Sequence, residues 1–283
     1  MKSEKIIKPN NGYTMLMVVI ALVLAISALL FTTRNPAFIF LSPIIIALLP
    51  GFFIVNPNNS RVLVLFGAYK GTVKENGFFF TNPLYTKQKI SLRARNFDSE
   101  RVKVNDKVGN PILINVILVW KVRDTYKAAF DVDVYEHFVR VQTDAAVRKL
   151  AGSYPYDNFD EERVAITLRS GLEEVNDALE HELTERLAIA GIEVMEARIG
   201  YLAYAPEIAS SMLKRQQAVA IVSARKKIVE GAVGMVEDAL ERLTADGIVD
   251  FDDDKKASMA SNLMVVLCGD KEATPVINTG TLH

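Results

Sequence analysis

Apolar residues are distributed very unevenly along the chain, and the first fifth stands apart from the rest. Met15–Phe31 is a run of seventeen apolar or small residues without a charge, and Pro36–Val55 is a second uncharged run of twenty. Only Thr32–Asn35 separates the two runs. At about 1.5 Å rise per residue, helices of these lengths reach roughly 26 and 30 Å, close to the ~30 Å hydrocarbon core of a bilayer. The pattern predicts a membrane hairpin over residues 15–55, after an N-terminal tail over residues 1–14.

Two other interpretations of these runs stay open on the sequence alone. A buried helical hairpin would also be apolar, although uncharged runs this long are rare in globular cores. A cleaved signal peptide would match the early Lys2, Lys5 and Lys8, but the run is longer than a usual h-region and no small-x-small cleavage motif follows it. Pro43 and Pro50 each remove a helical hydrogen bond, so the second run either spans the bilayer or forms a kinked re-entrant wedge.

The charges beside the hairpin predict its orientation. Six basic residues flank its two ends: Lys2, Lys5, Lys8, Arg61, Lys70 and Lys74. The connection between the two runs carries only Arg34. Because basic residues are retained on the cytoplasmic side, we expect the N-terminus and the following domain to lie in the cytoplasm. The predicted location is the plasma membrane, in a bacterium the inner membrane.

After residue 55 the pattern changes to short strands and amphipathic helices. The candidate strands are Arg61–Phe66, Lys87–Arg95, Phe97–Val104, Ile112–Val122 and Ile192–Tyr204. Helical spacing marks Val134–Leu150 and Glu161–Ala190. Strands and helices in separate runs are typical of an α+β domain, which we predict over residues 56–205. The predicted fold class is therefore a membrane-anchored α+β protein.

A long helix is predicted over residues 206–247, opened by Pro206 and ended at Asp246–Gly247. Apolar residues recur in it every seven positions, as in a coiled coil. The positions predicted to join copies of the chain are Val219, Val222, Val229, Val233, Val236, Leu240 and Leu243. A straight helix of about 40 residues, ~60 Å long, cannot fold back over its own apolar stripe. We expect the stripe to pack between copies; packing on the chain's own domain is the alternative.

Residues 248–283 are predicted to form a short helix and a tail. The acidic run Asp252–Asp254 lacks the spaced ligands and the glycine of a calcium loop. It suits the start of a helix over Ala257–Cys268, where acidic side chains are favourable. The tail could hold one last short strand over Thr274–Thr279.

Three consecutive aromatic residues, Phe78, Phe79 and Phe80, follow Gly77. A strand that buries alternate residues would turn at least one of these rings outward. The triplet is either a patch that contacts membrane lipid or a strand buried on both faces, and the sequence favours neither.

The remaining composition argues against several function classes. A net charge of −1 gives no basic field for nucleic acid, and the single Cys268 allows neither an internal disulfide nor a zinc site. His137, His181 and His283 lack the spacing of metal-ligand motifs, and no phosphate loop or nucleophile elbow occurs. We predict that the chain is not an enzyme and has no catalytic residue, cofactor or metal.

Several segments together resemble the stomatin/prohibitin/flotillin (SPFH, band-seven) superfamily. They are Arg61–Gly67, Gly77–Pro83, Val119–Val122 with Asp124, Tyr204–Ile208 and Lys214–Ala218. The likeness covers roughly residues 56–230, and the two-run hairpin is more similar to the stomatin side. It implies a two-lobed SPFH domain followed by a helical segment.

The resemblance also implies a function. It implies a membrane scaffold that oligomerises into a large ring or cage enclosing a membrane microdomain. The alternative is a regulator or adaptor of a membrane protease or channel. The expected partners are further copies of the chain, membrane lipid and such a client protein, with no nucleic acid.

Overall fold

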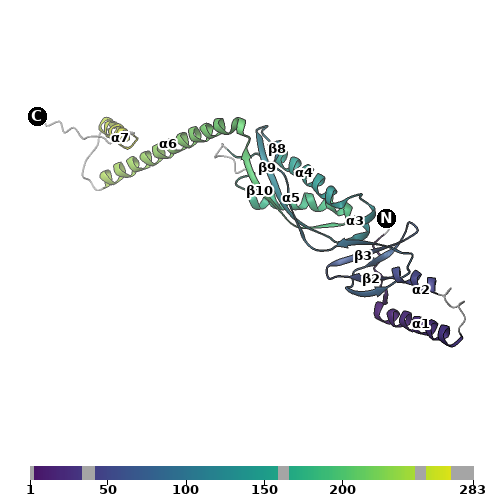
Figure 1. The fold of residues 1–283 in the computed structure, drawn as a ribbon. Helices are drawn as coiled ribbons and strands as arrows, with labels where there is room; N and C mark the ends of the chain where they lie inside the picture. The colour runs from purple at the N-terminus through teal and green to yellow at the C-terminus, as the bar shows by residue number, and fades with distance from the viewer. Residues whose placement is uncertain (1–2, 34–41, 159–165, 246–252, 269–283) are drawn as a thin grey trace, which may run out of the picture. The chain divides into compact units, whose positions relative to one another are not determined.

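A computed structural model describes residues 3–33, 42–158, 166–245 and 253–268 of the chain (Figure 1). The chain divides into two compact units at Ala205, the first over residues 1–205 and the second over residues 206–283. The strand predicted over Thr274–Thr279 lies outside the described residues.

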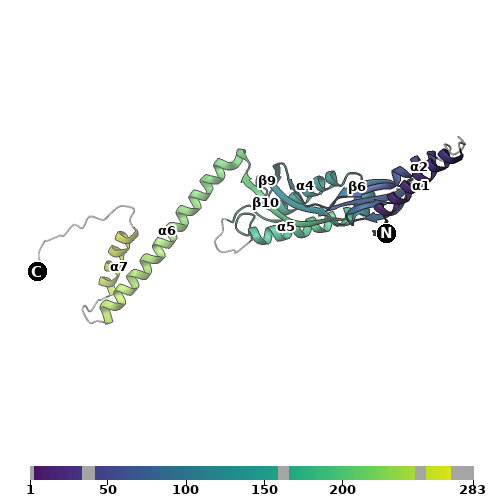
Figure 2. The ribbon, with the colours of Figure 1, turned by 60° about the horizontal axis from the view of Figure 1, so that its bottom comes forward.

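The first apolar run forms a single long helix, α1, from Gly12 to Thr33. Within the described residues, it is the only helix long and apolar enough to cross a membrane, and 6% of its apolar window is buried inside the chain. The second run differs from the prediction. Its described part begins with α2, Ser42–Leu48, whose seven residues rise only about 10 Å. Figures 1 and 2 show α1 and α2 together at one end of the first unit.

The end of the second run belongs to a sheet and not to the hairpin. Pro50 lies in a short 3-10 turn, η2 (Leu49–Gly51), and strand β2 follows at Phe52–Val55. Aromatic and β-branched residues favour strands, and here they pair with another apolar strand. The folded body therefore begins at residue 52 instead of 56, because a continuous run of apolar residues does not distinguish a lipid-facing helix from a buried strand.

Among the described residues of the first unit, the strands form three antiparallel sheets. One has the order β1-β5-β2, with β1 at Asn10–Asn11 and β5 at Gly77–Phe80. The second has the order β4-β3-β6, made of Ala68–Val73, Asn59–Leu65 and Thr86–Ser91. The third has the order β10-β9-β7, made of Ile192–Tyr204, Pro111–Val122 and Arg95–Asp98, and β8 (Val102–Asn105) also pairs with β9. The two long strands β9 and β10 confirm the predicted ones.

The strand predicted over Phe97–Val104 is wrong in its middle, where β7 ends and β8 begins. The buried Ser99 interrupts the strand there, because its hydroxyl accepts a hydrogen bond from the Val116 amide at 2.9 Å. The Ser99 amide also donates to the Val116 carbonyl at 2.9 Å. Val116 of β9 thus forms hydrogen bonds with both the backbone and the side chain of Ser99, and the chain changes direction there between β7 and β8.

The main core lies between the third sheet and two helices, α4 (Tyr135–Ser153) and α5 (Leu172–Leu187). Figures 1 and 2 show both helices running alongside β9 and β10. Ile112, Ile114, Val116, Leu118, Leu179, Leu183 and Leu187 are completely buried, each with an exposed fraction of 0%. A short helix, α3 (Thr125–Phe130), connects β9 to α4, and Asp124 caps its start.

The helix predicted over Glu161–Ala190 is shorter than expected. Residues 161–165 lie outside the described residues, and α5 begins only at Leu172. Before it, the Thr167 side chain binds Ser170 at 2.7 Å, and the Leu168 amide donates to the Pro155 carbonyl at 2.9 Å. These contacts hold a turn in place of a helix and bury Leu168, after which η3 (Ala188–Ala190) ends the segment.

The described part of the second unit is a pair of helices. Helix α6 spans Pro206–Ala245, forty residues that confirm the predicted long helix. Helix α7 spans Asp253–Cys268 and packs against α6. It begins four residues earlier than predicted, so Asp253 and Asp254 lie inside its first turn, where the helix dipole favours acidic groups.

Candidate membrane-anchoring and assembly sites

The two ends of the apolar hairpin are joined to the same strand. Strand β5 lies between β1, just before α1, and β2, just after η2. Its Phe80 pairs with Asn10 on one side and with Phe52 on the other. The chain therefore leaves the body and re-enters it at one place, which puts the N-terminal tail and the body on the same side of the hairpin.

The phenylalanine triplet packs on both faces of this strand. Phe79 faces a small core of Phe53, Val55, Leu63 and Val73, with ring centroids 6.0 Å from Phe53. The other two rings lie on the opposite face. Phe78 stacks on Phe52 at 5.5 Å and Phe80 meets Phe52 edge-on at 4.9 Å. Phe80 is buried by the chain itself, and contact of any of the three rings with lipid stays a prediction.

Glycines allow these rings to sit against both limbs of the hairpin. A Cβ on Gly12, the first residue of α1, would lie 2.5 Å from the Phe78 ring. A Cβ on Gly51, the last residue of η2, would lie 2.3 Å from the Phe80 ring. Because such distances are far below van der Waals contact, both positions require glycine. Side chains of β5 therefore pack against both ends of the hairpin.

The N-terminal tail is bound to the body through Glu4, a residue that no sequence pattern had singled out. The Glu4 carboxylate accepts hydrogen bonds from the Thr125 hydroxyl at 2.5 Å and the Thr125 amide at 3.2 Å. It also binds Lys74 Nζ at 2.7 Å. Next to it, Thr72 exchanges backbone hydrogen bonds with Lys5 and Ile7 at 2.8 and 2.9 Å. The tail thus covers the free edge of β4 before it reaches the hairpin.

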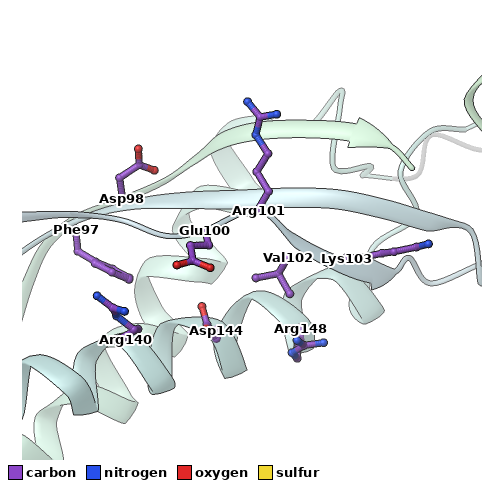
Figure 3. Close-up of a pocket in the computed structure, with 9 residues that line it drawn as sticks. All are labelled: Phe97, Asp98, Glu100, Arg101, Val102, Lys103, Arg140, Asp144 and Arg148. Atoms are coloured by element: carbon purple, nitrogen blue, oxygen red, sulfur yellow. The ribbon is translucent and has the colours of Figure 1, made fainter. Parts of the chain in front are cut away.

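A charged groove of about 560 Å³ lies between α4 and the β7–β8 stretch (Figure 3). Arg140, Asp144 and Arg148 follow one another at intervals of four residues on α4, so they share one face of that helix. Figure 3 shows Glu100 and Asp144 pointing toward each other, with the Arg140 guanidinium beside the Phe97 ring, 5.9 Å from its centroid.

Four charged side chains of this groove form no ion pair among the residues that the structure describes. They are Glu100, Arg140, Asp144 and Arg148, and none has an oppositely charged partner within 4.0 Å. Sequence reasoning missed the groove because its residues come from separate segments. The available signal was the charge repeat on α4.

The seven predicted assembly positions fall into three groups on α6. Val222, Val229 and Val233 are exposed, at 68%, 43% and 39%. Val236 is 6% exposed, and the nearby Ala232 is fully buried. Both lie in α6, which packs against α7. Val219, Leu240 and Leu243 are half-buried.

A neighbouring line on α6 was missed by the sequence analysis. Ile221, Ile228 and Met235 repeat every seven residues and are 58%, 51% and 55% exposed. Each of them precedes a residue of the Val222, Val229 and Val236 line, so the two lines lie about 100° apart and border a wide, mostly apolar face that also carries Arg225. The seven-residue repeat of these three residues is visible in the sequence, but it lies outside the two lines of heptad positions that were considered.

The candidate catalytic side chains are not brought together. His137 is an exposed residue of α4, and His181 lies on α5, where its Nε2 atom is 3.4 Å from Glu185. No group of three or more His, Cys, Asp or Glu side chains that could hold a metal occurs among the residues described. Cys268 is half-buried at the end of α7. The absence of enzymatic activity stays a prediction.

Comparison with known families gives one match. The model of the "SPFH domain / Band 7 family" matches residues 53–232, about 180 of the 283 residues. The matched region begins at β2, in agreement with the start of the folded body, and extends into α6. A comparison with curated protein sequences found no match.

Proposed function

The chain belongs to the SPFH domain / Band 7 family, and on that basis we propose that it is a membrane scaffold whose copies assemble into a large ring or cage around a patch of membrane. The SPFH domain and the apolar helix α1 fit a membrane-associated scaffold in general. The ring, the enclosed microdomain and the identity of the membrane are the proposed parts.

The observation that carries the proposal is the exposed apolar face of α6. Val222 and Ile221 are more than half exposed, and so is Ile228, one helical repeat further on. Burying one such side chain stabilises an interface by about 1.5–3 kcal/mol. Since α7 covers only the stretch around Val236, a second copy of α6 is the proposed cover for the remainder.

The experiment that tests the scaffold uses a lysine-reactive cross-linker on intact membranes. Lys214, Lys226 and Lys227 are exposed on α6 and can report neighbouring copies. We expect a ladder of products that extends well beyond a dimer. A single monomer band, in membranes where the protein is inserted, would count against side-by-side assembly.

The proposed orientation has its own test. The shared strand β5 supports one side for the N-terminus and the body, and the flanking lysines favour the cytoplasm as that side. Ser3→Cys and Asp98→Cys, each in a Cys268→Ser background, should both resist an impermeant thiol reagent in intact cells. Labelling of the Asp98→Cys variant from outside would reverse the orientation.

A second role, as regulator or adaptor of a membrane protease or channel, is supported by the charged groove. Its charges are placed to form ion pairs with a client. The double variant Arg140→Glu/Arg148→Glu should release a protease or channel that co-purifies in stoichiometric amount, while cross-linking through α6 continues. If no such client co-purifies with the unaltered protein, the scaffold role stands alone.

A further inference from the structure

The turn between β3 and β4 carries a side chain that its backbone disfavours. Leu65 and Ala68 pair across a two-residue turn made of Phe66 and Gly67. Both turn residues have positive φ, 48° and 81°. Turns of this kind prefer Asn-Gly, because a side chain with a Cβ strains the left-handed conformation and asparagine tolerates it best.

Packing inside the chain does not explain the phenylalanine. Its side chain is 86% exposed, the second most exposed of the large hydrophobic residues that the structure describes after Phe31 in α1. Phe66 thus departs from two local preferences: a positive φ favours Gly or Asn, and a large apolar side chain is usually buried. Such exceptions cluster at positions that serve a function.

The sheet register places this turn at the hairpin end of the body. Val64 of β3 pairs with Thr86 of β6, so Leu84, two residues before Thr86, extends from the same end as Phe66. Leu84 is 63% exposed. The loop that carries it begins at Thr81, whose amide donates to the carbonyl of Gly51 at 3.0 Å. Lys87 Nζ donates to the carbonyl of Pro50, which lies in the 3-10 turn η2 just before β2.

We propose that Phe66 and Leu84 form a foot that inserts into the lipid interface beside the membrane hairpin. This inference rests on the proposed membrane anchoring of the hairpin. Aromatic rings are favoured at the boundary between headgroups and acyl chains. The exposed Lys70, three residues after the turn, adds attraction for anionic headgroups. The foot would give the body a contact with the bilayer separate from the hairpin and so restrict its tilt.

The test places a polarity-sensitive nitrobenzoxadiazole dye at single cysteines in a Cys268→Ser background. The protein is reconstituted in phosphatidylcholine/phosphatidylglycerol vesicles that contain a lipid-borne quencher. Phe66→Cys is compared with Val108→Cys, which lies in the turn between β8 and β9 and is 69% exposed. The twelve-residue β9 separates the two ends of the body by about 40 Å. Figure 1 shows β8 and β9 reaching the end of the first unit far from α1 and α2, and the turn that carries Val108 connects these two strands.

We expect the dye at position 66 to be several-fold brighter than the dye at position 108 and to be quenched by the lipid-borne quencher. Position 108 should behave as in water. A dye on Leu24→Cys in the middle of α1 reports the hairpin separately. Quenching at 24 without quenching at 66 overturns the foot and leaves the anchoring intact. Absence of quenching at both overturns the foot together with the anchoring. A bright but unquenched dye at 66 assigns the foot to a protein contact and overturns the lipid proposal.

The variant Phe66→Asn separates turn stability from lipid contact. Asparagine suits the positive φ, so the melting temperature should stay unchanged or rise. Quenching of a dye on Leu84→Cys should fall severalfold in this variant, while quenching at position 24 is kept. Full quenching at position 84 without the Phe66 ring would overturn its role.

Discussion

Apolar side chains are buried in the main core of the first unit, whereas many of them are exposed on the long helix α6. In the core, Leu118 of β9 and Leu183 of α5 are both completely buried within the chain. On α6, Val222 and Ile221 are 68% and 58% exposed, although their sequence pattern is as regular. The core is complete in one copy. The apolar face of α6 is not covered by the described part of the chain, and this difference is the basis for proposing that a second copy covers it.

The largest expected effect comes from charging the face of α6 that is free in one copy. In Val222→Asp/Val229→Asp, two carboxylates would have to be desolvated at every joint, at a cost of several kcal/mol each if unpaired. The large assembly should be lost while membrane insertion persists, since α1 is unchanged. Native mass after mild detergent extraction measures the outcome. Val236 is a poor probe, because it is already buried within one copy.

The matched control is Ala220→Asp/Lys227→Asp. It places two aspartates at the same seven-residue spacing, at exposed positions on the side of α6 away from both apolar lines. Assembly of this variant should be close to normal. Equal disruption by both pairs would show that α6 tolerates no charge anywhere and would remove the evidence for a specific face.

The converse experiment weakens the core. Leu183→Ala leaves a cavity beside β9, and substitutions of this kind cost about 2–5 kcal/mol. We expect a clearly lower midpoint in thermal unfolding, followed by circular dichroism, while the folded protein still assembles. Asp177→Ala, an exposed change on the same helix, is the control. Loss of assembly before unfolding would mean that the core and the joint are coupled.

The attachment of the N-terminal tail should have a smaller and local effect. Glu4→Ala removes the acceptor of Thr125 and the partner of Lys74, which leaves buried groups unsatisfied at a cost of about 1–3 kcal/mol. Hydrogen exchange at Ile7 and Thr72 should become faster. Glu75→Ala removes the exposed contact with Lys8 and should leave that exchange slow.

The ion pairs between α4 and α5 should matter less, and in a pH-dependent way. Hydrogen bonds from Lys149 and then Arg186 lower the pKa of Glu182. A lowered pKa in the folded state contributes stability above the unfolded pKa of about 4.3, and this is lost as the pH falls through the folded value. Glu182→Gln should cost about 0.2–1 kcal/mol near pH 7, and the gap to the unaltered protein should close below pH ~4. A gap that stays constant down to low pH would assign it to packing.

The smallest expected effect is at the histidines. His137→Ala and His181→Ala change exposed side chains that are not brought together with other metal-ligating or catalytic groups. Assembly and the cellular phenotype should be unchanged. Loss of phenotype in a variant that folds and assembles normally would reopen the possibility of catalysis.

How far the sequence predicts this molecule depends on the range of the interactions involved. The strand over Ile112–Val122 and the helix from Pro206 follow from local periodicity, and the structure confirms both. The fate of Phe52–Val55 was mispredicted, because an apolar run suits lipid and a buried strand equally. Only the pairing with β5, more than twenty residues away, decides between them.

The candidate sites show the same limit. The heptad on α6 was visible as a pattern, whereas its division into a covered part and an exposed part depends on α7. The bond from Glu4 to Thr125 spans 121 residues and has no local signature. Phe66 is the opposite case, because Phe-Gly between two strands could have been flagged from the sequence as an unusual turn.

The central claim is that copies of this chain complete one another through the exposed face of α6 and enclose a patch of membrane. The most direct measurement is electron microscopy of the unaltered protein extracted in mild detergent, together with its native mass. The account predicts closed rings or cages whose mass is many times the 31.4 kDa of one chain. Uniform monomers or dimers, extracted with the hairpin intact, would contradict it.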